Sequence, residues 1–398
     1  MTLRLIRLGI DPRRSFSVRL SGFFAAQFFV YGVQLPFLSV WLHWRGLDAA
    51  EIGIVTAAPL FLRLLIGPGA AFLADRSGDR RRAVVVAAGF TLVAVLALSQ
   101  SHDFLPILLS TAVFLLGVQT CAPIGEAIAL AGVKRLGADY GRMRLWGSLS
   151  FIAATFAGGA LVGQLGAGAI IGLLVASAAS LTVAAWAIPT LQNGVANAAG
   201  SSRALTLAQV ATVTGSGSFL LFILAAGVVQ ASHAVFYVFG ALHWQEQGIS
   251  PTTIGVLWSL GVLAEVVLFA ISGWFIRRVG PISLILAGAV AAVIRWVAMA
   301  FDPPLVLLFP LQILHALTFG ATHLGAMHFI HRTVPQEQAG TAQAVFAAAT
   351  GGVAMGSATL LAGTIYGPLG GTSYAAMAAL GAVGLVAAIA LKRRMPDQ

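Results

Sequence analysis

The stretch Ala71-Phe-Leu-Ala-Asp75-Arg76-Ser-Gly78-Asp-Arg80-Arg81-Arg82 follows one long apolar run and precedes another. About 200 residues later, again after an apolar run, the chain reads Gly273-Trp-Phe-Ile-Arg277-Arg278-Val-Gly280. Each copy is a tight basic turn that opens on a small residue and contains a glycine. A motif that recurs at this spacing predicts a chain made of two duplicated halves.

Composition places these turns between membrane-spanning helices. The 398 residues are 59% apolar and 9% charged, whereas a soluble domain carries about 25% charged residues. In lipid, a long apolar run satisfies its backbone groups by forming a helix. We therefore expect an all-α integral membrane protein with twelve transmembrane helices in two pseudo-symmetric six-helix bundles. The expected spans are 19–44, 49–73, 82–100, 104–132, 141–166, 168–190, 211–243, 251–276, 281–301, 304–330, 338–366 and 371–391.

The distribution of positive charge predicts how these helices are oriented. All but four of the 23 Lys and Arg residues fall in the terminal arms or in loops on one side. By the positive-inside rule this side is the cytoplasm, so both termini are expected there. The net charge of +10 is dispersed over loops rather than gathered in a stripe, so no nucleic-acid partner is expected.

Further repeats support the two halves. Leu42-His43-Trp44 ends the first apolar segment, and Leu242-His243-Trp244 ends the seventh. The spacing Gly159-x-x-x-Gly163 recurs as Gly363-x-x-x-Gly367. Polar and small residues between the halves are typical of a linker. We expect an N-terminal six-helix bundle over 1–190, a cytoplasmic linker over 191–208 and a C-terminal six-helix bundle over 209–398.

Polar residues inside the apolar segments indicate where a cavity lies, because such residues are costly in lipid. The first, fourth, seventh and tenth segments have polar side chains at helical spacing on one face. These residues are Gln27, Tyr31, Gln34, Gln119, Glu126, Gln230, His233, Tyr237, Gln312, His315, Thr318, Thr322 and His323. They predict the lining of a cavity, and ordinary hydrogen bonding between helices is the alternative.

Ionisable residues deep inside the expected helices need partners, since an isolated buried charge is expensive. There are five of them: Arg63, Glu126, Arg144, Glu265 and Arg295. Glu265 and Arg295 lie about 18 and 21 Å from the cytoplasmic ends of their helices, so we expect them to pair. Glu126 and Arg144 form a second expected pair. Both pairs could serve transport or could act as structural clamps.

The two basic turns resemble the helix 2–3 loop signature of the major facilitator superfamily and its degenerate copy between helices 8 and 9. Asp139-Tyr-Gly141-Arg142-Met-Arg144-Leu-Trp146-Gly147-Ser-Leu-Ser-Phe151 resembles the start of helix 5 in the lactose permease, phenylpropionate permease and nucleoside–proton symporter branches. The segment Leu314-His315-Ala-Leu-Thr318-Phe319-Gly320 is most similar to the phenylpropionate permease branch.

The resemblance implies roles for particular residues. Asp75, Arg76, Gly78 and Arg80 would form the gating motif of the loop. Glu126 and Arg144 would bind substrate, and Arg295 and His315 would belong to the proton-coupling set, to which we add Glu265.

The chain also departs from these relatives. Thr318 stands where lactose permease has its proton-accepting carboxylate, and Gln312 stands where it has a lysine. Phe151 replaces the tryptophan that stacks on sugar, so lactose is not the expected substrate. Asp79 occupies a position that is usually basic. The Gly-Pro pair of drug antiporters is absent from the fifth segment, which disfavours efflux.

These observations predict a secondary active transporter rather than an enzyme. We expect it to import a small organic substrate, such as the aromatic acid phenylpropionate, by proton symport with alternating access in a bacterial inner membrane. The expected substrate-binding residues are Glu126, Arg144, Tyr31, Gln34, Gln119, Gln230, His233 and Tyr237, with an aromatic wall of Phe23, Phe28, Tyr31, Phe151, Phe236 and Tyr237. No cofactor, catalytic residue or metal site is expected, and a monomer is expected. The alternatives are a proton-driven efflux antiporter of lipophilic compounds, a nucleoside or sugar symporter, and a sensor that transports nothing.

Overall fold

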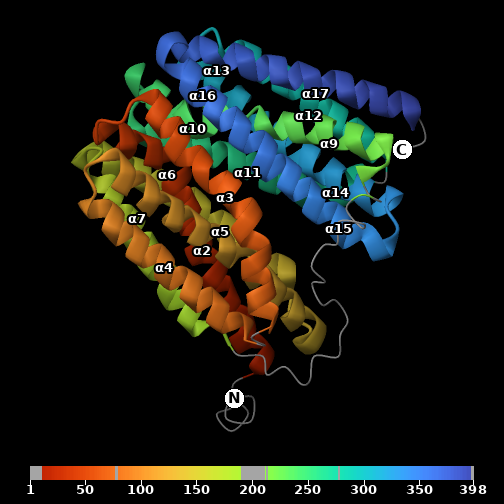
Figure 1. Cartoon of the computed structure of the whole chain (residues 1–398), viewed down its shortest axis with the longest axis horizontal. Coiled ribbons are helices and arrows are strands. Elements are labelled where there is room, and N and C mark those ends of the chain that lie inside the picture. Colours follow the sequence, from red (N-terminus) through yellow and green to blue (C-terminus); the bar gives the residue numbers. More distant parts are fainter. Residues whose placement is uncertain (1–10, 77–78, 190–210, 212–213, 277, 396–398) are drawn as a thin grey trace. The chain divides into compact units, whose positions relative to one another are not determined.

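The computed structural model describes residues 11–76, 79–189, 211, 214–276 and 278–395, and within them every regular element is helical. Figure 1 labels the elements. Their bounds are α2 Pro12–Trp44, α3 Ala49–Arg76, α4 Arg80–Gln100, α5 Phe104–Leu136, α6 Tyr140–Leu165, α7 Ala169–Ala187, α9 Gly217–Ala231, α10 Ala234–Glu246, α11 Pro251–Ile276, α12 Pro281–Met299, α13 Leu305–Ile313, η1 Ala316–Ala321, α14 Thr322–Thr333, α15 Gln336–Ala347, η2 Ala348–Ala354, α16 Met355–Leu369, η3 Gly370–Ser373 and α17 Tyr374–Arg394.

The described residues contain eleven helical segments long and apolar enough to cross a membrane. The last of them, Gln336–Arg394, has 59 residues and would be about 88 Å long as one helix, nearly three times the hydrocarbon thickness. Gly370, with φ +51°, divides it at the 3₁₀ turn η3. It therefore holds the two expected spans 338–366 and 371–391, and the all-α membrane fold is confirmed.

Three expected spans depart from a continuous α-helix. The segment expected at 211–243 breaks into α9 and α10 at Ser232 and His233. The segment expected at 304–330 contains the π-helix η1, and the segment expected at 338–366 contains the π-helix η2. Irregular backbone inside a membrane helix is tolerated where it is buried in protein or lines a cavity.

Two helix starts are determined by local capping. Helix α2 begins at Pro12, seven residues before the expected apolar start, because the Oδ1 atom of Asp11 accepts the N–H of Arg13 at 2.9 Å and proline suits the first turn. Helix α4 is capped by Asp79, whose Oδ1 accepts the N–H of Arg82 at 3.0 Å. This cap gives a local reason for an acidic residue in the basic turn.

The chain forms two compact units. The first comprises Met1–Trp41 and Leu65–Ala204, and the second comprises Leu42–Leu64 and Leu205–Gln398. In the first unit α4 packs along α5 and α7, and in the second α12 packs along α17, α14 and η1. The expected bundles at 1–190 and 209–398 stay predictions, and the whole of the expected linker at 191–208 lies outside the described residues.

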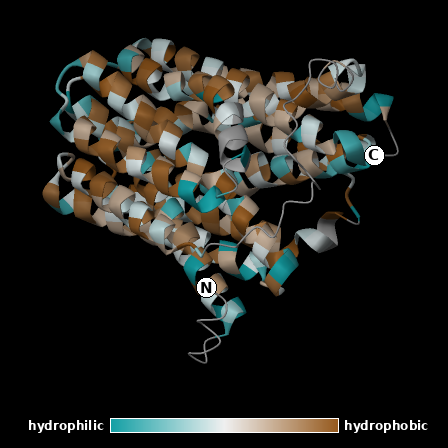
Figure 2. Cartoon of the chain, turned by 60° about the horizontal axis from the view of Figure 1, so that its bottom comes forward, coloured by the Kyte–Doolittle hydropathy of each residue, from teal (hydrophilic) through white to brown (hydrophobic). Residues whose placement is uncertain are grey.

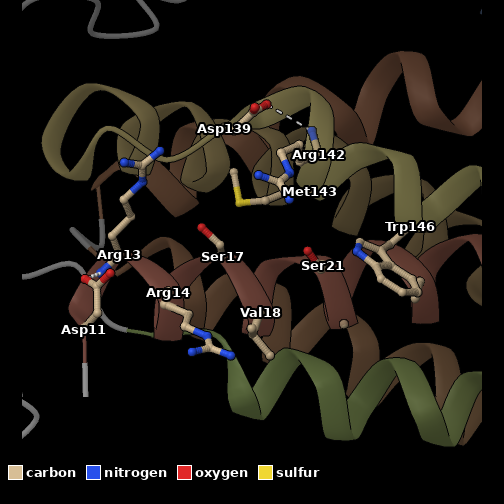
Figure 3. Close-up of a pocket in the computed structure, with 12 residues that line it drawn as sticks. Asp11, Arg13, Arg14, Ser17, Val18, Ser21, Asp139, Arg142, Met143 and Trp146 are labelled. Carbon is tan, nitrogen blue, oxygen red and sulfur yellow. Dashed lines mark hydrogen bonds between the residues drawn. The ribbon is translucent and has the colours of Figure 1, made fainter. Parts of the chain in front are cut away.

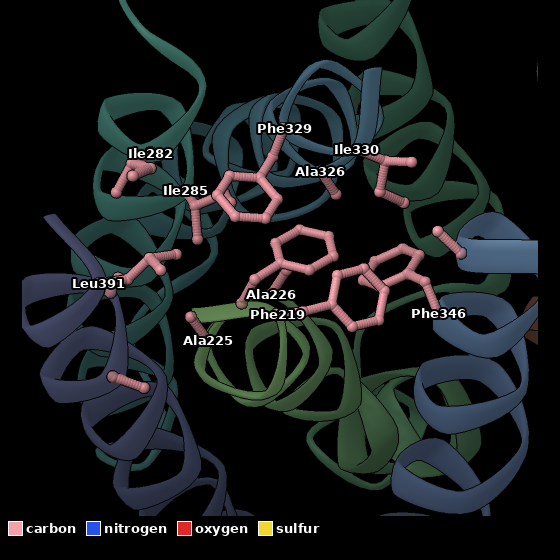
Figure 4. Packing of buried hydrophobic residues seen from close by; sticks show 14 residues of the cluster. Phe219, Ala225, Ala226, Ile282, Ile285, Ala326, Phe329, Ile330, Phe346 and Leu391 are labelled. Carbon is pink, nitrogen blue, oxygen red and sulfur yellow. The ribbon is translucent and has the colours of Figure 1, made fainter. Parts of the chain in front are cut away.

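The second unit has a well-packed apolar core at one end of its helices (Figure 4). Phe222 of α9 stacks on Phe329 of α14 at 4.4 Å between ring centroids, and on Phe346 of α15 at 5.1 Å. Ile285 of α12 and Leu391 of α17 close the cluster. Aromatic stacking and burial of these rings hold five helices together.

Apolar side chains also cover the outside of the helices. On α4, Val86, Phe90 and Val93 are 49%, 60% and 65% exposed at spacing i, i+4, i+7. Figure 2 shows hydrophobic residues along the helices and hydrophilic residues concentrated in loops and at helix ends. Such stripes are incompatible with water and suit contact with lipid.

Candidate functional site

Arg295 of α12 is completely buried and is held by neutral acceptors of the second unit. Its Nη2 donates to Oε1 of Gln312 at 2.9 Å, and its Nη1 donates to Oγ1 of Thr318 at 3.3 Å and to Nδ1 of His315 at 3.2 Å. The guanidinium also lies over the rings of Phe236 and Trp296 at 4.8 and 4.6 Å. These contacts replace the hydration that a buried cation loses.

His315 stands between Arg295 and Glu265. Arginine has donors only, so Nδ1 of His315 must be the acceptor and the neutral ring carries its hydrogen on Nε2. That nitrogen lies 3.8 Å from Oε2 of Glu265. His315 therefore contacts both members of the expected Glu265–Arg295 pair, Arg295 through Nδ1 and Glu265 through Nε2.

His233 extends the network to α9 and α10. Its Nδ1 lies 3.0 and 3.2 Å from the carbonyl oxygens of Gln230 and Val229, and carbonyls only accept, so Nδ1 carries the hydrogen. Nε2 is then the acceptor of the Thr318 hydroxyl at 2.9 Å. Thr318, which replaces the expected carboxylate, accepts from Arg295 and donates to His233.

The network lies where two helices depart from α geometry. His233 is at the break between α9 and α10, and Thr318 is inside the π-helix η1. Nε1 of Trp296 donates to Oγ of Ser232 at 2.8 Å and so secures the break. Around it, Tyr237 stacks on His233 at 5.3 Å and Trp258 stacks on Phe236 at 4.7 Å. The sequence predicted His315, Thr318 and His233 on polar faces, but not their meeting at these irregular turns.

In the first unit, Arg144 and Glu126 meet through a residue that the sequence analysis missed. Both interact with the hydroxyl of Tyr140, in the first turn of α6. The Arg144 guanidinium lies 3.9 Å from the ring centroid of Phe28, and Phe28 makes an edge contact with Tyr31 at 5.3 Å. Arg144 is half-buried and Glu126 exposed, so both remain open to a ligand.

The other predicted residues differ in their surroundings. Gln27 is buried and its Nε2 donates to the carbonyl of Val118 at 3.0 Å, which joins α2 to α5. Tyr31, Gln34 and Gln119 are half-buried. Gln230 of the second unit is also half-buried and donates to the carbonyl of Phe319 at 3.4 Å. In the expected aromatic wall, Phe23, Phe151 and Phe236 are buried, whereas Phe28, Tyr31 and Tyr237 are half-buried.

The loop motif is only partly described. Gly78 lies outside the described residues, and of Asp75 only the helical backbone is described. Arg76 is exposed and Arg80 half-buried. The neighbouring Arg81 donates through Nη2 to the carbonyl of Trp186 at 2.6 Å, which fastens the end of α7 to the start of α4.

A second polar network lies at the other end of α10. His243 is buried, its Nε2 lies 2.7 Å from Oδ1 of Asp302, and its Nδ1 lies 3.2 Å from the hydroxyl of Tyr366. The Tyr366 hydroxyl donates to Oε2 of Glu246 at 2.9 Å. Glu246 is the last residue of α10, and Asp302 lies in the loop between α12 and α13. Nothing in the sequence spacing of these two acids indicated that both would lie beside one histidine.

Within the described residues no three His, Cys, Asp or Glu side chains are grouped so that they could hold a metal ion.

Comparison with known proteins matches this chain to a family model and to transporters. A family model described as "MFS_1 like family" matches residues 17–376. The chain is 35% identical over 346 residues to the "Probable 3-phenylpropionic acid transporter" of Escherichia coli (strain K12), covering 86% of this chain and 89% of that protein. It is 29% identical over 351 residues to the "Maltose permease" of Geobacillus stearothermophilus, covering 86% and 85%.

Solved structures share the fold. The crystal structure of the nucleoside transporter NupG matches with a TM-score of 0.83 and 16% identity over 96% of this chain and 100% of that one. A bacterial homologue of the human lysosomal transporter Spinster, in an inward-facing and unoccupied conformation, matches with a TM-score of 0.77 and 15% identity over 96% and 98%.

Proposed function

The chain belongs to the MFS_1 like family and is therefore a multi-pass membrane transporter, not an enzyme. We propose that it imports an aromatic carboxylate by proton symport with alternating access. The main support for symport is the position of His315 between Glu265 and Arg295. A carboxylate, an imidazole and a guanidinium in one buried row can hold or release a proton as their spacing changes.

The substrate class is supported by the surroundings of Arg144. A guanidinium binds a carboxylate through two parallel hydrogen bonds, and the ring of Phe28 beside it can stack on an aromatic substrate. Tyr140 adds a hydroxyl to the same site. The name of the relative with 35% identity, a 3-phenylpropionic acid transporter, agrees with this chemistry.

In this proposal the two clusters have different tasks. The half-buried Arg144 and the exposed Glu126 hold the substrate, together with the half-buried Tyr31, Gln34 and Gln119. Arg295 and His233 are completely buried, and the two Nη atoms of Arg295 and both ring nitrogens of His233 already bond to protein atoms, so these residues serve coupling rather than direct contact with substrate. Glu265, whose side chain is 20% exposed, is the group that takes up the proton.

A nucleoside or sugar symporter is the second candidate. It is favoured by the 29% identity to a maltose permease, and the exposed carboxylate Glu126 could accept hydrogen bonds from ribose or glucose hydroxyls.

We further propose that the protein lies in the bacterial inner membrane as a monomer with both termini in the cytoplasm. The support is the concentration of Lys and Arg in loops of one side. A reporter fused after Gln398 should be active only as a cytoplasmic reporter, and one inserted near Asp103 only as an external one. An external C-terminus would refute this topology.

The test of transport is substrate-driven proton movement in proteoliposomes that contain the purified protein. We expect 3-phenylpropionate to alkalinise the outside medium, while adenosine and maltose do not. Arg144→Lys keeps the charge but loses the planar fork, so KM for the aromatic acid should rise about 10- to 100-fold. Arg332→Lys, on an exposed residue at the end of α14, is the matched control. Proton movement driven by maltose or adenosine instead would favour the second candidate.

A further inference from the structure

A cavity of about 590 Å³ opens between the first turns of α2 and α6 in the first unit (Figure 3). Its two walls are matching helix faces, because residues 18, 21, 22 and 25 of α2 and 139, 142, 143 and 146 at the start of α6 follow the spacing i, i+3, i+4, i+7. Neither Glu126 nor Arg144 lines it. The groove is therefore separate from the cluster proposed to bind substrate.

The head of the groove is positively charged. Arg13 and Arg14 come from α2 and Arg142 comes from α6. The two carboxylates in the lining, Asp11 and Asp139, each accept a backbone N–H, from Arg13 at 2.9 Å and Arg142 at 3.0 Å, and so act as helix caps. Among the described residues no ion pair joins any of the three guanidinium groups to a carboxylate. Three arginines are thus available to an anion.

Two serine hydroxyls lie beside these arginines. Some serines of this chain bond back to their own helix, as Ser177 does to Leu174 O at 2.8 Å and Ser259 to Gly255 O at 2.8 Å. Ser17 and Ser21 have no hydrogen-bond partner within the described part of the chain, and their hydroxyls lie on the side of α2 that faces α6. They add two donors to the charged end of the groove.

The far end of the groove is apolar and open. Val18 is 64% exposed and Trp146 is 55% exposed. Both belong to helix turns next to the arginines, which is the level where tryptophan and basic residues lie at a membrane interface. The groove therefore offers charge and hydroxyl donors to a head group and an apolar wall to a chain.

We propose that this groove binds the phosphate head group of an anionic phospholipid, with an acyl chain along Val18 and Trp146. The guanidinium groups would form forked hydrogen bonds to phosphate oxygens, and the two serines would donate to the head group. This site would hold α6, which contains Arg144, against α2, and it does not depend on which substrate is transported.

The test uses the full-length protein in detergent with short-chain phosphatidylglycerol, phosphatidylcholine of the same chains, or inorganic phosphate. We expect phosphatidylglycerol to raise the unfolding temperature, with little effect from the other two. Arg142→Gln combined with Arg13→Gln should weaken the phosphatidylglycerol Kd at least about tenfold, through loss of charge-assisted hydrogen bonds. Ser17→Ala combined with Ser21→Ala should weaken the phosphatidylglycerol Kd about threefold. This pair of changes alters no charge and leaves the helix caps Asp11 and Asp139 in place.

Arg332→Gln is the matched control, since it removes an exposed arginine outside the groove. Equal effects of phosphatidylglycerol and phosphatidylcholine, or equal losses in Arg332→Gln and the groove variants, would overturn the proposal. Binding of inorganic phosphate with the same Kd as the lipid would overturn the assignment to lipid and assign the groove to a soluble phosphate. The unfolding temperature of each variant without lipid shows whether it is folded.

Discussion

Nε2 of His315 lies 3.8 Å from Oε2 of Glu265, and it is the ring nitrogen that carries the hydrogen when Nδ1 accepts from Arg295. A proton that reaches Glu265 therefore removes the negative charge that faces this N–H. The charge on each of these two groups therefore acts directly on the other.

Glu265→Gln should uncouple transport. The amide keeps the size and a hydrogen-bond acceptor but cannot gain or lose a proton, so exchange of substrate across the membrane should continue while accumulation against a gradient is lost. Counterflow and uphill uptake in the same vesicles measure the two activities. Glu337→Gln, in the exposed first turn of α15, should change neither. Continued uphill accumulation in Glu265→Gln would show that another group carries the proton.

Thr318→Val should destabilise the second unit by about 1–3 kcal/mol, because it removes the hydrogen bond to Nε2 of the buried His233 and one of the two acceptors of Arg295 Nη1, which keeps only His315. Thr318→Ser retains the hydroxyl and should lose much less. Thermal unfolding in detergent measures both. Thr364→Val is the control, since that hydroxyl bonds only to its own helix, at Leu361 O. An equal loss in the serine variant would mean that packing of the methyl group, not the hydrogen bonds, is important.

The two tyrosines near His243 should respond in opposite ways to loss of the hydroxyl. Tyr366→Phe removes the link between His243 and Glu246, so we expect a loss of about 1 kcal/mol or more. Among the described residues the buried hydroxyl of Tyr374 has no hydrogen-bond partner, so Tyr374→Phe should be neutral or stabilising. Unfolding temperatures of both variants, measured side by side, give the answer. A larger loss in Tyr374→Phe would contradict the assigned network.

Gly363→Ala should be harmful where Gly367→Ala is not. A Cβ on Gly363 would lie 2.7 Å from Cα of Gly53, which is backbone of α3 and cannot rotate away. A Cβ on Gly367 would meet Cβ of Ala49 at an ordinary 3.7 Å. We expect the first change to cost about 1–3 kcal/mol by overpacking and to slow transport. Similar transport rates for the two variants would show that the close approach of these helices is not needed.

Much of the fold followed from the sequence because lipid leaves the backbone few choices. Apolar runs had to become helices, and the polar positions Gln312, His315 and Thr318 did meet in one cluster. The break at Ser232 and His233 could not be predicted, because neither residue is glycine or proline and the break is held by a bond from Trp296. Tertiary contacts of this kind leave no local pattern.

The internal repeat was found, but its register at the helix ends was not. Gly46 N–H bonds to His43 O and Gly248 N–H bonds to Gln245 O, each at 2.9 Å, so these turns are equivalent. The structural counterpart of His243 is then Trp41, and not His43 as the matching Leu-His-Trp letters suggested. Both Trp41 and His243 are buried, whereas His43 is exposed. Identical letters two positions out of register gave a false equivalence, and backbone hydrogen bonds gave the true one.

The π-helix η1 has a consequence for how this chain compares with its homologues. Oγ1 of Thr322 lies 3.5 Å from the carbonyl of Leu317, five residues earlier, as expected where one extra residue widens a turn. A homologue with a regular α-helix here should carry a one-residue deletion between Ala316 and Ala321. Alignments that force these helices together without a gap would displace every position beyond the deletion by about 100° around the helix axis. Genuine counterparts of Thr322 would then be assigned to the wrong face.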